Sequence, residues 1–275
     1  MKKINQIICL LVITIIVNAC GKTELSTSEN IFPTGKSLVK FFLLSPNTGS
    51  VMIKDNDVKV NSLTSGSAGI FPGIINSSAE YVALTPNSNI SFALPFAGTG
   101  SDSIVLFRSI LSLAADKNYS AVLADTAADR TMFLVNDNAG GLPNDSTYNI
   151  RLINAMAKSP NLSLVRIDSA NATQVTRDTI VRDLAFKSAS DYVNVPLTAK
   201  VNPASTTTPK SIYSFLRYRI IITSSGLPLA GTITPPQTVS SPGLNQRYIS
   251  VYASGFATGT GALAPTLQTT IVYNK

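Results

Sequence analysis

Carboxylates are the side chains that could carry out acid–base chemistry in this chain, because histidine is absent. The lack of histidine excludes a Ser-His-Asp triad, a histidine-bound metal and an imidazole general base. Two carboxylates can still hydrolyse a glycosidic bond. Glu80 and Asp191 are the pair to consider, but an internal repeat assigns them to different halves of the chain. We therefore expect solvent-facing acids of edge strands and no catalytic residue.

Two further groups of acidic residues suggest specific chemistry. Asp125-Thr126 and Asp178-Thr179 lack the glycine of the Asp-Thr-Gly sequence and are unrelated by the repeat, so a protease dyad is rejected. Asp55-Asn56-Asp57 and Asn136-Asp137-Asn138 offer oxygen ligands that suit calcium, but each lacks the glycine and distal glutamate of a full calcium loop. Because turns favour Asp and Asn, we expect turns here, with calcium binding as the alternative. The sequence predicts no metal site and no cofactor.

Four tyrosines alternate with small residues and could stack on sugar rings: Tyr81, Tyr119, Tyr192 and Tyr248. They also recur at matched positions of the internal repeat. Recurrence at matched positions suits core or corner tyrosines better than a ligand platform, so we expect structural roles.

The N-terminus has the pattern of an export signal. Lys2 and Lys3 precede the apolar stretch 7–17, which is too short to span a bilayer. Val17-Asn18-Ala19-Cys20-Gly21 then resembles a bacterial lipobox, in which the cysteine receives a diacylglyceryl group and becomes the mature N-terminus. The alternative is an ordinary secretory signal with a chance cysteine.

The lipobox reading predicts a signal peptide over 1–19, a lipid-anchored tether over 20–36 and lipidation of Cys20. Cleavage removes Cys9, so the mature chain has one cysteine and no disulfide. No aspartate follows Cys20 at the position that retains many lipoproteins in the inner membrane, which favours the outer membrane. We expect a cell-envelope protein whose membrane contact is its lipid.

Short β-strands are expected throughout the rest of the chain. Residues 51–54 and 58–60 suggest two strands around a polar turn, and 119–123 and 130–135 are further β-rich runs. In 216–220 the apolar side chains alternate with arginines, as in a half-buried strand. No window after the signal peptide has a helical period. The predicted fold class is all-β.

An internal repeat is the strongest structural signal, because five matches occur in the same order. The matched pairs are Val39-Lys40-Phe41 with Ile150-Arg151-Leu152, Ser45-Pro46-Asn47 with Ser159-Pro160-Asn161, Tyr81-Val82 with Tyr192-Val193, Tyr119 to Val122 with Tyr248 to Val251, and Phe133 to Asn136 with Ile271 to Asn274. The copies occupy 37–138 and 148–275, with a Gly/Pro/Asn-rich linker over 139–147. Their size predicts two tandem immunoglobulin-like β-sandwich domains.

These segments resemble the family called domain of unknown function 4397. The resemblance is carried by Leu38-Val39-Lys40-Phe41, by the run 113–125, and by Arg151-Leu152-Ile153-Asn154-Ala155, which is close to the family's opening motif. In the first copy Lys40 stands where arginine is common, and Leu43 occupies the asparagine position. The family occurs in secreted or lipid-anchored bacterial proteins, many of them from Bacteroidetes. The resemblance implies a β-sandwich and offers no catalytic residues.

The function that the sequence predicts is a non-enzymatic surface interaction module with an unknown protein or glycan partner. The alternative is an accessory glycan-binding lipoprotein of a polysaccharide-uptake system, which the absence of tryptophan weakens. Nucleic acid is excluded as a partner because the net charge of +7 is spread without a Lys/Arg-rich run.

O-glycosylation is a further expectation, which rests on the resemblance to bacteria of that group. Such bacteria modify Asp-Ser/Thr followed by a small aliphatic residue, Met or Thr in exported proteins. Five triplets of this kind occur here, with the candidate acceptors Ser103, Thr126, Ser146, Ser169 and Thr179. Each acceptor should be exposed at a turn or strand end, because a bulky glycan cannot be packed inside. Strand alternation with polar ends is the competing explanation for the triplets.

Overall fold

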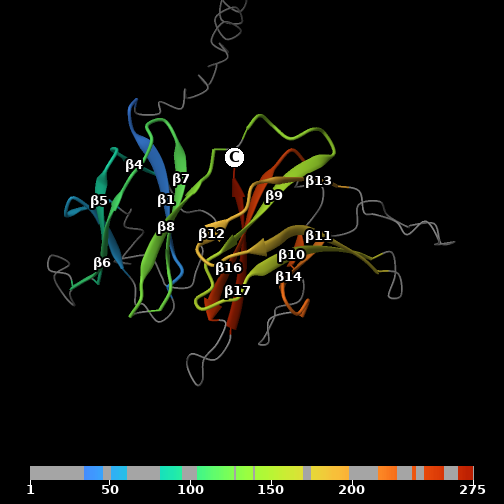
Figure 1. Cartoon of the computed structure of the whole chain (residues 1–275). Helices are drawn as coiled ribbons and strands as arrows, with labels where there is room; N and C mark the ends of the chain where they lie inside the picture. Colours follow the sequence, from blue (N-terminus) through green and yellow to red (C-terminus); the bar gives the residue numbers. More distant parts are fainter. Residues whose placement is uncertain are drawn as a thin grey trace, which may run out of the picture. The chain divides into compact units, whose positions relative to one another are not determined.

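The computed structural model of the chain consists of strands, turns and connecting segments (Figure 1). It describes residues 34–45, 51–60, 81–94, 104–126, 128–138, 140–169, 175–197, 216–227, 237–239, 245–256 and 266–274. Every regular element within these ranges is a β-strand, so the predicted all-β class is confirmed. Among the described residues, no helix has the length and apolar character needed to cross a membrane. The predicted signal peptide, with Cys20, and the tether up to residue 33 lie outside the described ranges.

The first half of the fold contains two four-stranded sheets. The first inner sheet has the order β4 (Val82–Leu84), β1 (Ser37–Leu43), β7 (Asn118–Ala124) and β8 (Thr131–Asn136). The first outer sheet has the order β3 (Val58–Lys59), β2 (Met52–Asp55), β5 (Ser88–Leu94) and β6 (Ile104–Leu111). Within the inner sheet, β1 and β7 are parallel, and the other neighbours are antiparallel.

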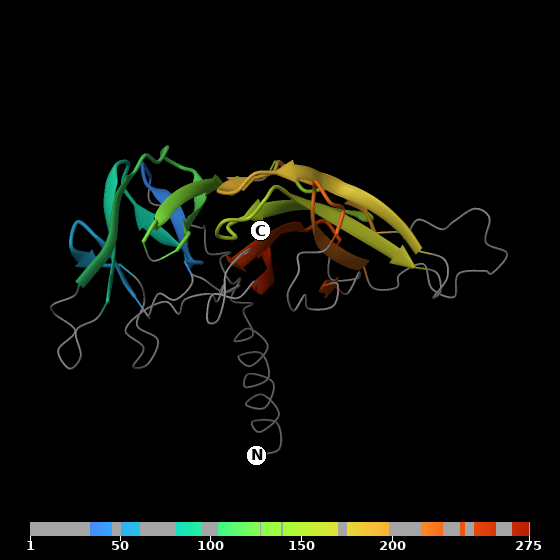
Figure 2. The ribbon, with the colours of Figure 1, turned by 60° about the horizontal axis from the view of Figure 1, so that its bottom comes forward.

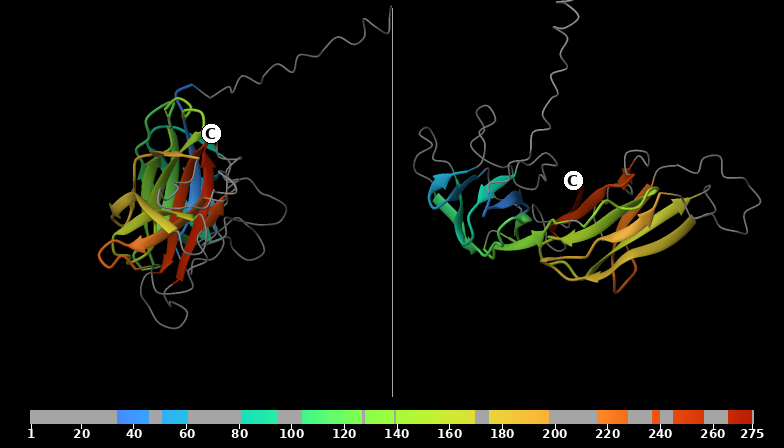
Figure 3. Two further views of the ribbon diagram at one scale, coloured as in Figure 1. Left: turned by 90° about the vertical axis from the view of Figure 1, so that its right-hand side faces the viewer. Right: turned by 90° about the horizontal axis from the view of Figure 1, so that it is seen from above.

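The second half repeats this strand order. Its inner sheet has the order β12 (Ser188–Ala189), β9 (Thr147–Asn154), β16 (Tyr248–Phe256) and β17 (Thr266–Asn274), and β13 (Val193–Pro196) also pairs with β9. Its outer sheet has the order β11 (Val175–Leu184), β10 (Leu162–Ser169), β14 (Leu216–Ile222) and β15 (Gln237–Val239). Again the two central inner strands, β9 and β16, are parallel. Figure 2 shows the long β10 and β11 of this half, and Figure 3 shows β16 beside β17 in red.

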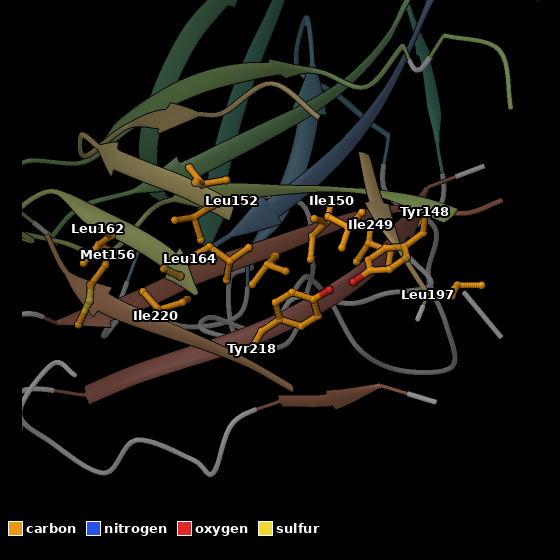
Figure 4. Close-up of a cluster of buried hydrophobic side chains, with 14 residues drawn as sticks. Tyr148, Ile150, Leu152, Met156, Leu162, Leu164, Leu197, Tyr218, Ile220 and Ile249 are labelled. Carbon is orange, nitrogen blue, oxygen red and sulfur yellow. The ribbon is translucent and has the colours of Figure 1, made fainter. Parts of the chain in front are cut away.

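Each half has its own apolar core between inner and outer sheet. Val39, Phe41 and Phe92 belong to the core of the first half, and all are at least 96% buried. Ile150 and Leu164 belong to the core of the second half, to which β9, β10, β14 and β16 contribute (Figure 4). Apolar side chains of facing sheets thus interlock, as expected of β-sandwiches.

A third apolar cluster joins the two inner sheets through their opposite faces. It includes Phe42 and Val122 from the first half and Ile153 and Tyr252 from the second, all at most 1% exposed. The central inner strands are therefore buried on both faces. Double burial explains why the sequence around Phe42 and Ile153 is almost continuously apolar instead of alternating.

The strand register corrects two of the sequence matches, that of Tyr119 with Tyr248 and that of Asn136 with Asn274, because Asn136 pairs with Tyr119 and Tyr273 pairs with Ile249. Val39 pairs with Tyr119 in the first half, and its counterpart Ile150 pairs with Ile249 in the second. Ile249 is therefore the structural counterpart of Tyr119, and the match of Tyr119 with Tyr248 is wrong by one residue. A shift of one residue moves a side chain to the other face of the sheet.

The two predicted copies meet at a short connection. β8 ends at Asn136 and β9 begins at Thr147, and Leu142 between them is exposed. Residues 35–275 nevertheless group into one compact unit, in which the third cluster links both halves. The division into domains 37–138 and 148–275, and their immunoglobulin-like character, stay predictions.

Candidate functional site

The most unusual group of side chains is a buried ion cluster between the two inner sheets. We define it as Lys40, Tyr81, Ser120, Asp137, Arg151, Tyr192, Ser250 and Tyr252. At its centre the Arg151 guanidinium pairs through Nη2 with Oδ1 of Asp137, and the two side chains are 3% and 1% exposed. Arg151 Nε donates to Ser250 Oγ at 2.7 Å, and Nη1 donates to the Asn136 carbonyl at 2.7 Å. One guanidinium on β9 thereby holds the end of β8 and a residue of β16.

The second oxygen of Asp137 continues the network. Ser120 Oγ on β7 donates to Asp137 Oδ2 at 2.6 Å, and the Tyr252 hydroxyl donates to Ser120 Oγ at 3.2 Å. The Tyr252 ring lies 4.9 Å from the Phe42 ring, so its hydroxyl joins the ion cluster to the apolar cluster. The carboxylate of the first half is thus held by groups from both halves, which is the arrangement that a buried charge requires.

Each half places a cation over a tyrosine ring. Lys40 Nζ lies 4.4 Å from the ring centroid of Tyr81, and Arg151 Cζ lies 4.5 Å from that of Tyr192. Strand register makes Arg151 the counterpart of Lys40, and Tyr192 follows Arg151 by the same interval as Tyr81 follows Lys40. Cation–ring attraction strengthens when the cation is desolvated, as both are here.

Burial controls protonation in the cluster. It raises the pKa of the Asp137 carboxyl, an effect that the neighbouring Arg151 charge opposes. Burial, together with the Asp137 charge, raises the pKa of the Tyr252 hydroxyl far above its ordinary value of 10.0. Tyr252 therefore remains a hydrogen-bond donor at neutral pH. Groups that are buried and bonded to one another in this way are arranged to hold two sheets together.

The ion cluster was missed from the sequence, although its signals were present. Asn136-Asp137-Asn138 was interpreted as a turn or calcium loop, whereas Asp137 is the buried counterion of Arg151. The flanking asparagines do form a local turn, because the Asn138 side chain donates to Asn136 Oδ1 at 2.7 Å. The match of Lys40 with Arg151 in the repeat, each followed by a tyrosine 41 residues later, could have indicated paired cation–ring contacts.

The other candidate calcium loop forms a tight hairpin turn. Asn56 and Asp57 have φ of 48° and 66°, as a two-residue turn between β2 and β3 requires. Asp55 Oδ1 accepts from the Asn56 side chain at 3.0 Å, and Asp57 pairs with Arg108 at 2.9 Å. No group of three or more His, Cys, Asp or Glu side chains in the described ranges is arranged to hold a metal.

Of the five candidate glycosylation acceptors, Ser146 and Thr126 are described with their side chains at turns or bends. Ser146 is exposed, has φ of 60° and donates its backbone N–H to Asn245 Oδ1 at 2.9 Å. Thr126 is half-buried, and its hydroxyl donates to Asp129 Oδ2 at 3.3 Å. Ser146 therefore meets the exposure condition most fully.

The remaining acceptors differ in their settings. Thr179 is half-buried and lies in the middle of β11, opposite Val165, away from a strand end. Ser169 is the last residue of β10 and pairs with Val175. Ser103 lies outside the described residues, directly before β6. The structure does not bring the five acceptors into one site.

The carboxylates considered for catalysis are not brought together, whereas Tyr81, Tyr192 and Tyr248, considered for sugar binding, lie in or against the ion cluster. Glu80 lies outside the described residues, and Asp191 is exposed. Tyr119 packs against the first core, and its hydroxyl accepts from the Ala114 N–H at 3.2 Å. Tyr248 is 5% exposed, donates to the Gly141 carbonyl at 2.7 Å and meets Tyr192 edge-on at 4.9 Å.

No protein-family model matches the chain, and no curated protein sequence matches it. The resemblance to domain of unknown function 4397 therefore stays a prediction.

Proposed function

We propose that the chain is a non-enzymatic lipoprotein of the cell envelope, anchored in the outer membrane through Cys20, whose folded part binds a partner. The observation that carries the proposal is that buried charged side chains hold the two inner sheets together. The buried Arg151 and Asp137, which could have served chemistry, hold the inner sheets together. This buried ion pair stabilises a rigid scaffold, so the sheet edges and turns are left as the surfaces for recognition.

The anchor is tested by the variant Cys20→Ala. Wild-type protein from a bacterial host with lipoprotein processing should enter the detergent phase on phase separation, because of its acyl chains. The variant should accumulate as unprocessed precursor or leave that phase. An unchanged partition and an unchanged mass would overturn lipid anchoring.

The binding role is tested by crosslinking on intact cells. Wild-type protein should give a reproducible adduct with one partner, and Cys20→Ala, which has the same folded part, should give less of it. A glycan array covers the alternative of a glycan-binding lipoprotein, which specific binding of the wild-type protein to one arrayed glycan would favour. Release of a product from any arrayed glycan would overturn the non-enzymatic assignment.

Glycosylation is tested by intact-mass measurement of protein purified from its native host. A mass above that of the acylated chain, reduced by one glycan in Ser146→Ala, supports modification at the exposed turn. Ser163→Ala is the matched control, because Ser163 is 3% exposed and bonds to Thr223. A mass equal to the acylated polypeptide alone would end the idea.

A further inference from the structure

The edge strand β6 has features of an interaction surface. It has eight residues, Ile104–Leu111, and in the described part of the chain it pairs only with β5 (Figure 1). Ile104, Val105 and Ile110 on this strand are 67%, 45% and 65% exposed. An edge strand presents backbone N–H and C=O groups that can pair with another extended chain.

A bulge in β6 sorts its side chains between the two faces of the outer sheet. Phe92 pairs with Phe107 but the next residue, Ala93, pairs with Val105, so Leu106 is the extra residue. Both Leu106 and Phe107 pack against the first core. In a regular strand, side chains three residues apart point to opposite faces. Because the bulge adds one residue between Val105 and Arg108, both of these side chains lie on the outward face.

The outward face also carries a row of basic residues. Lys59 pairs with Lys54, Lys54 with Ser91, and Ser91 with Arg108, and residues paired in this way share one face of a sheet. Ile110 pairs with Asn89, two residues before Ser91, and so lies on the same face. Arg108 thus stands between the exposed apolar side chains of Val105 and Ile110.

The carboxylate of Asp57 already contacts this row of basic residues. Asp57, in the turn between β2 and β3, pairs with Arg108 at 2.9 Å, with 71% and 47% of the two side chains exposed. An exposed pair of this kind contributes little to stability and is open to exchange with an incoming carboxylate. Lys54, Lys59 and Arg108 thus place three basic side chains on this face.

We propose that β6 is the docking strand of this module and that its ligand is an extended peptide whose side chains along one face are apolar, acidic and apolar in turn. The inference rests on the proposed binding function and specifies its surface. Backbone pairing along the edge requires an extended chain and supplies affinity, and alternate side chains supply specificity. An acidic side chain meets Arg108, and apolar side chains cover Val105 and Ile110.

Another long edge strand, β11, lacks these features. Its ten residues include Arg177, Asp178, Arg182 and Asp183, and its pairing with β10 has two register shifts. Charges and irregular pairing are the usual protection of an edge against added strands. β6 has one charged residue, so only β6 of these two long edges is suited to pairing with a peptide.

The test uses the full-length protein in detergent and a fluorescent, capped octapeptide with Val, Glu and Val at positions 2, 4 and 6 and Thr elsewhere, followed by fluorescence anisotropy. Wild type should bind it saturably, and Ile110→Lys should lower the affinity at least tenfold. Arg108→Gln should lower it several-fold, whereas Asp57→Asn should raise it, because the competing carboxylate is gone. Leu227→Lys is the matched control, since Leu227 is 64% exposed in the second half, and should bind as wild type.

Several results would overturn the inference. A peptide that is N-methylated at every residue has no backbone N–H to donate to the edge, so equal binding of it would exclude strand addition. Retention by vesicles of phosphatidylglycerol without peptide binding would assign the basic row to a membrane. A cellular crosslink that persists in Ile110→Lys would leave the proposed function in place and reject β6 as its surface.

Discussion

The two halves of the molecule place different cations over a tyrosine ring at equivalent buried positions. Lys40 and Arg151 occupy equivalent positions on β1 and β9, and each lies over a tyrosine ring. Arg151 also binds the Asp137 carboxylate, the Asn136 carbonyl and Ser250 Oγ. The difference follows from chemistry, since a planar guanidinium has five donors in a fixed fork and an ammonium is a point charge.

The contrast shows how a repeated fold acquires one asymmetric contact. The third apolar cluster takes equivalent positions from both halves: Phe42 and Val122 pair on β1 and β7, and Ile153 and Tyr252 pair on β9 and β16. The ion pair breaks that equivalence, because Asp137 lies where the chain leaves the first half. Arginine is therefore needed only where the chain passes from one half to the other.

Removal of the carboxylate should have the largest effect. Asp137→Ala leaves Arg151 buried without its counterion and should lower the free energy of unfolding by about 3–5 kcal/mol. Urea unfolding followed by circular dichroism measures this loss. Asp57→Ala, which breaks the exposed pair with Arg108, should cost under about 1 kcal/mol. Similar losses in both variants would mean that the buried pair has no special role.

Exchange of the two cations tests the difference directly. Arg151→Lys should destabilise by about 2–3 kcal/mol, because one ammonium cannot satisfy a carboxylate, a carbonyl and a hydroxyl in that fork. Lys40→Arg keeps the charge over Tyr81 and should change stability by less than about 1 kcal/mol. Equal effects of the two exchanges would refute the asymmetry.

Loss of the Tyr192 ring should destabilise the protein more than loss of the Tyr81 ring, because Tyr192 contacts Arg151 and Tyr81 contacts Lys40. Tyr192→Leu removes the contact with Arg151 and the edge-on contact with Tyr248, and should cost about 2 kcal/mol. Tyr81→Leu removes the contact with Lys40 and should cost about 1 kcal/mol. Thermal melting of both variants at neutral pH gives the comparison, and a larger loss in Tyr81→Leu would reverse it.

Local sequence patterns were enough to predict some of the strands. The polar turn between 51–54 and 58–60 is the hairpin of β2 and β3, and the alternation in 216–220 is part of β14. Both signals are local, since turn residues and period-two alternation act within a few residues. The repeated strand order of the two halves likewise agrees with matches at equal spacing, such as that of Val39 with Ile150.

Contacts between layers could not be predicted in the same way. Phe42 and Ile153 have apolar neighbours on both sides in sequence, which indicates double burial but not the partner face. Tyr119 and Tyr248 share a sequence context, yet pairing with β1 and β9 shifts them by one residue. The counterion of Arg151 lies in an Asx-rich segment that looks like an ordinary turn, and only the meeting of β8 with β9 gives Asp137 its role.

The effect of Tyr252→Phe on stability should be small at neutral pH, but it should change sign in alkali. Loss of the hydrogen bond to Ser120 should cost about 1 kcal/mol at pH 8. The pKa of Tyr252 is raised in the folded state above its ordinary 10.0, so its contribution to stability is complete below pH 10 and is lost as the pH rises further. In wild type the loss from this group is about 1.4 kcal/mol per pH unit, and the variant escapes it. Unfolding free energies measured in urea from pH 8 to 11.5 should therefore cross near about pH 11. Parallel curves would show that Tyr252 ionises as readily in the folded protein as in the unfolded chain, which its burial between Phe42 and Ser120 argues against.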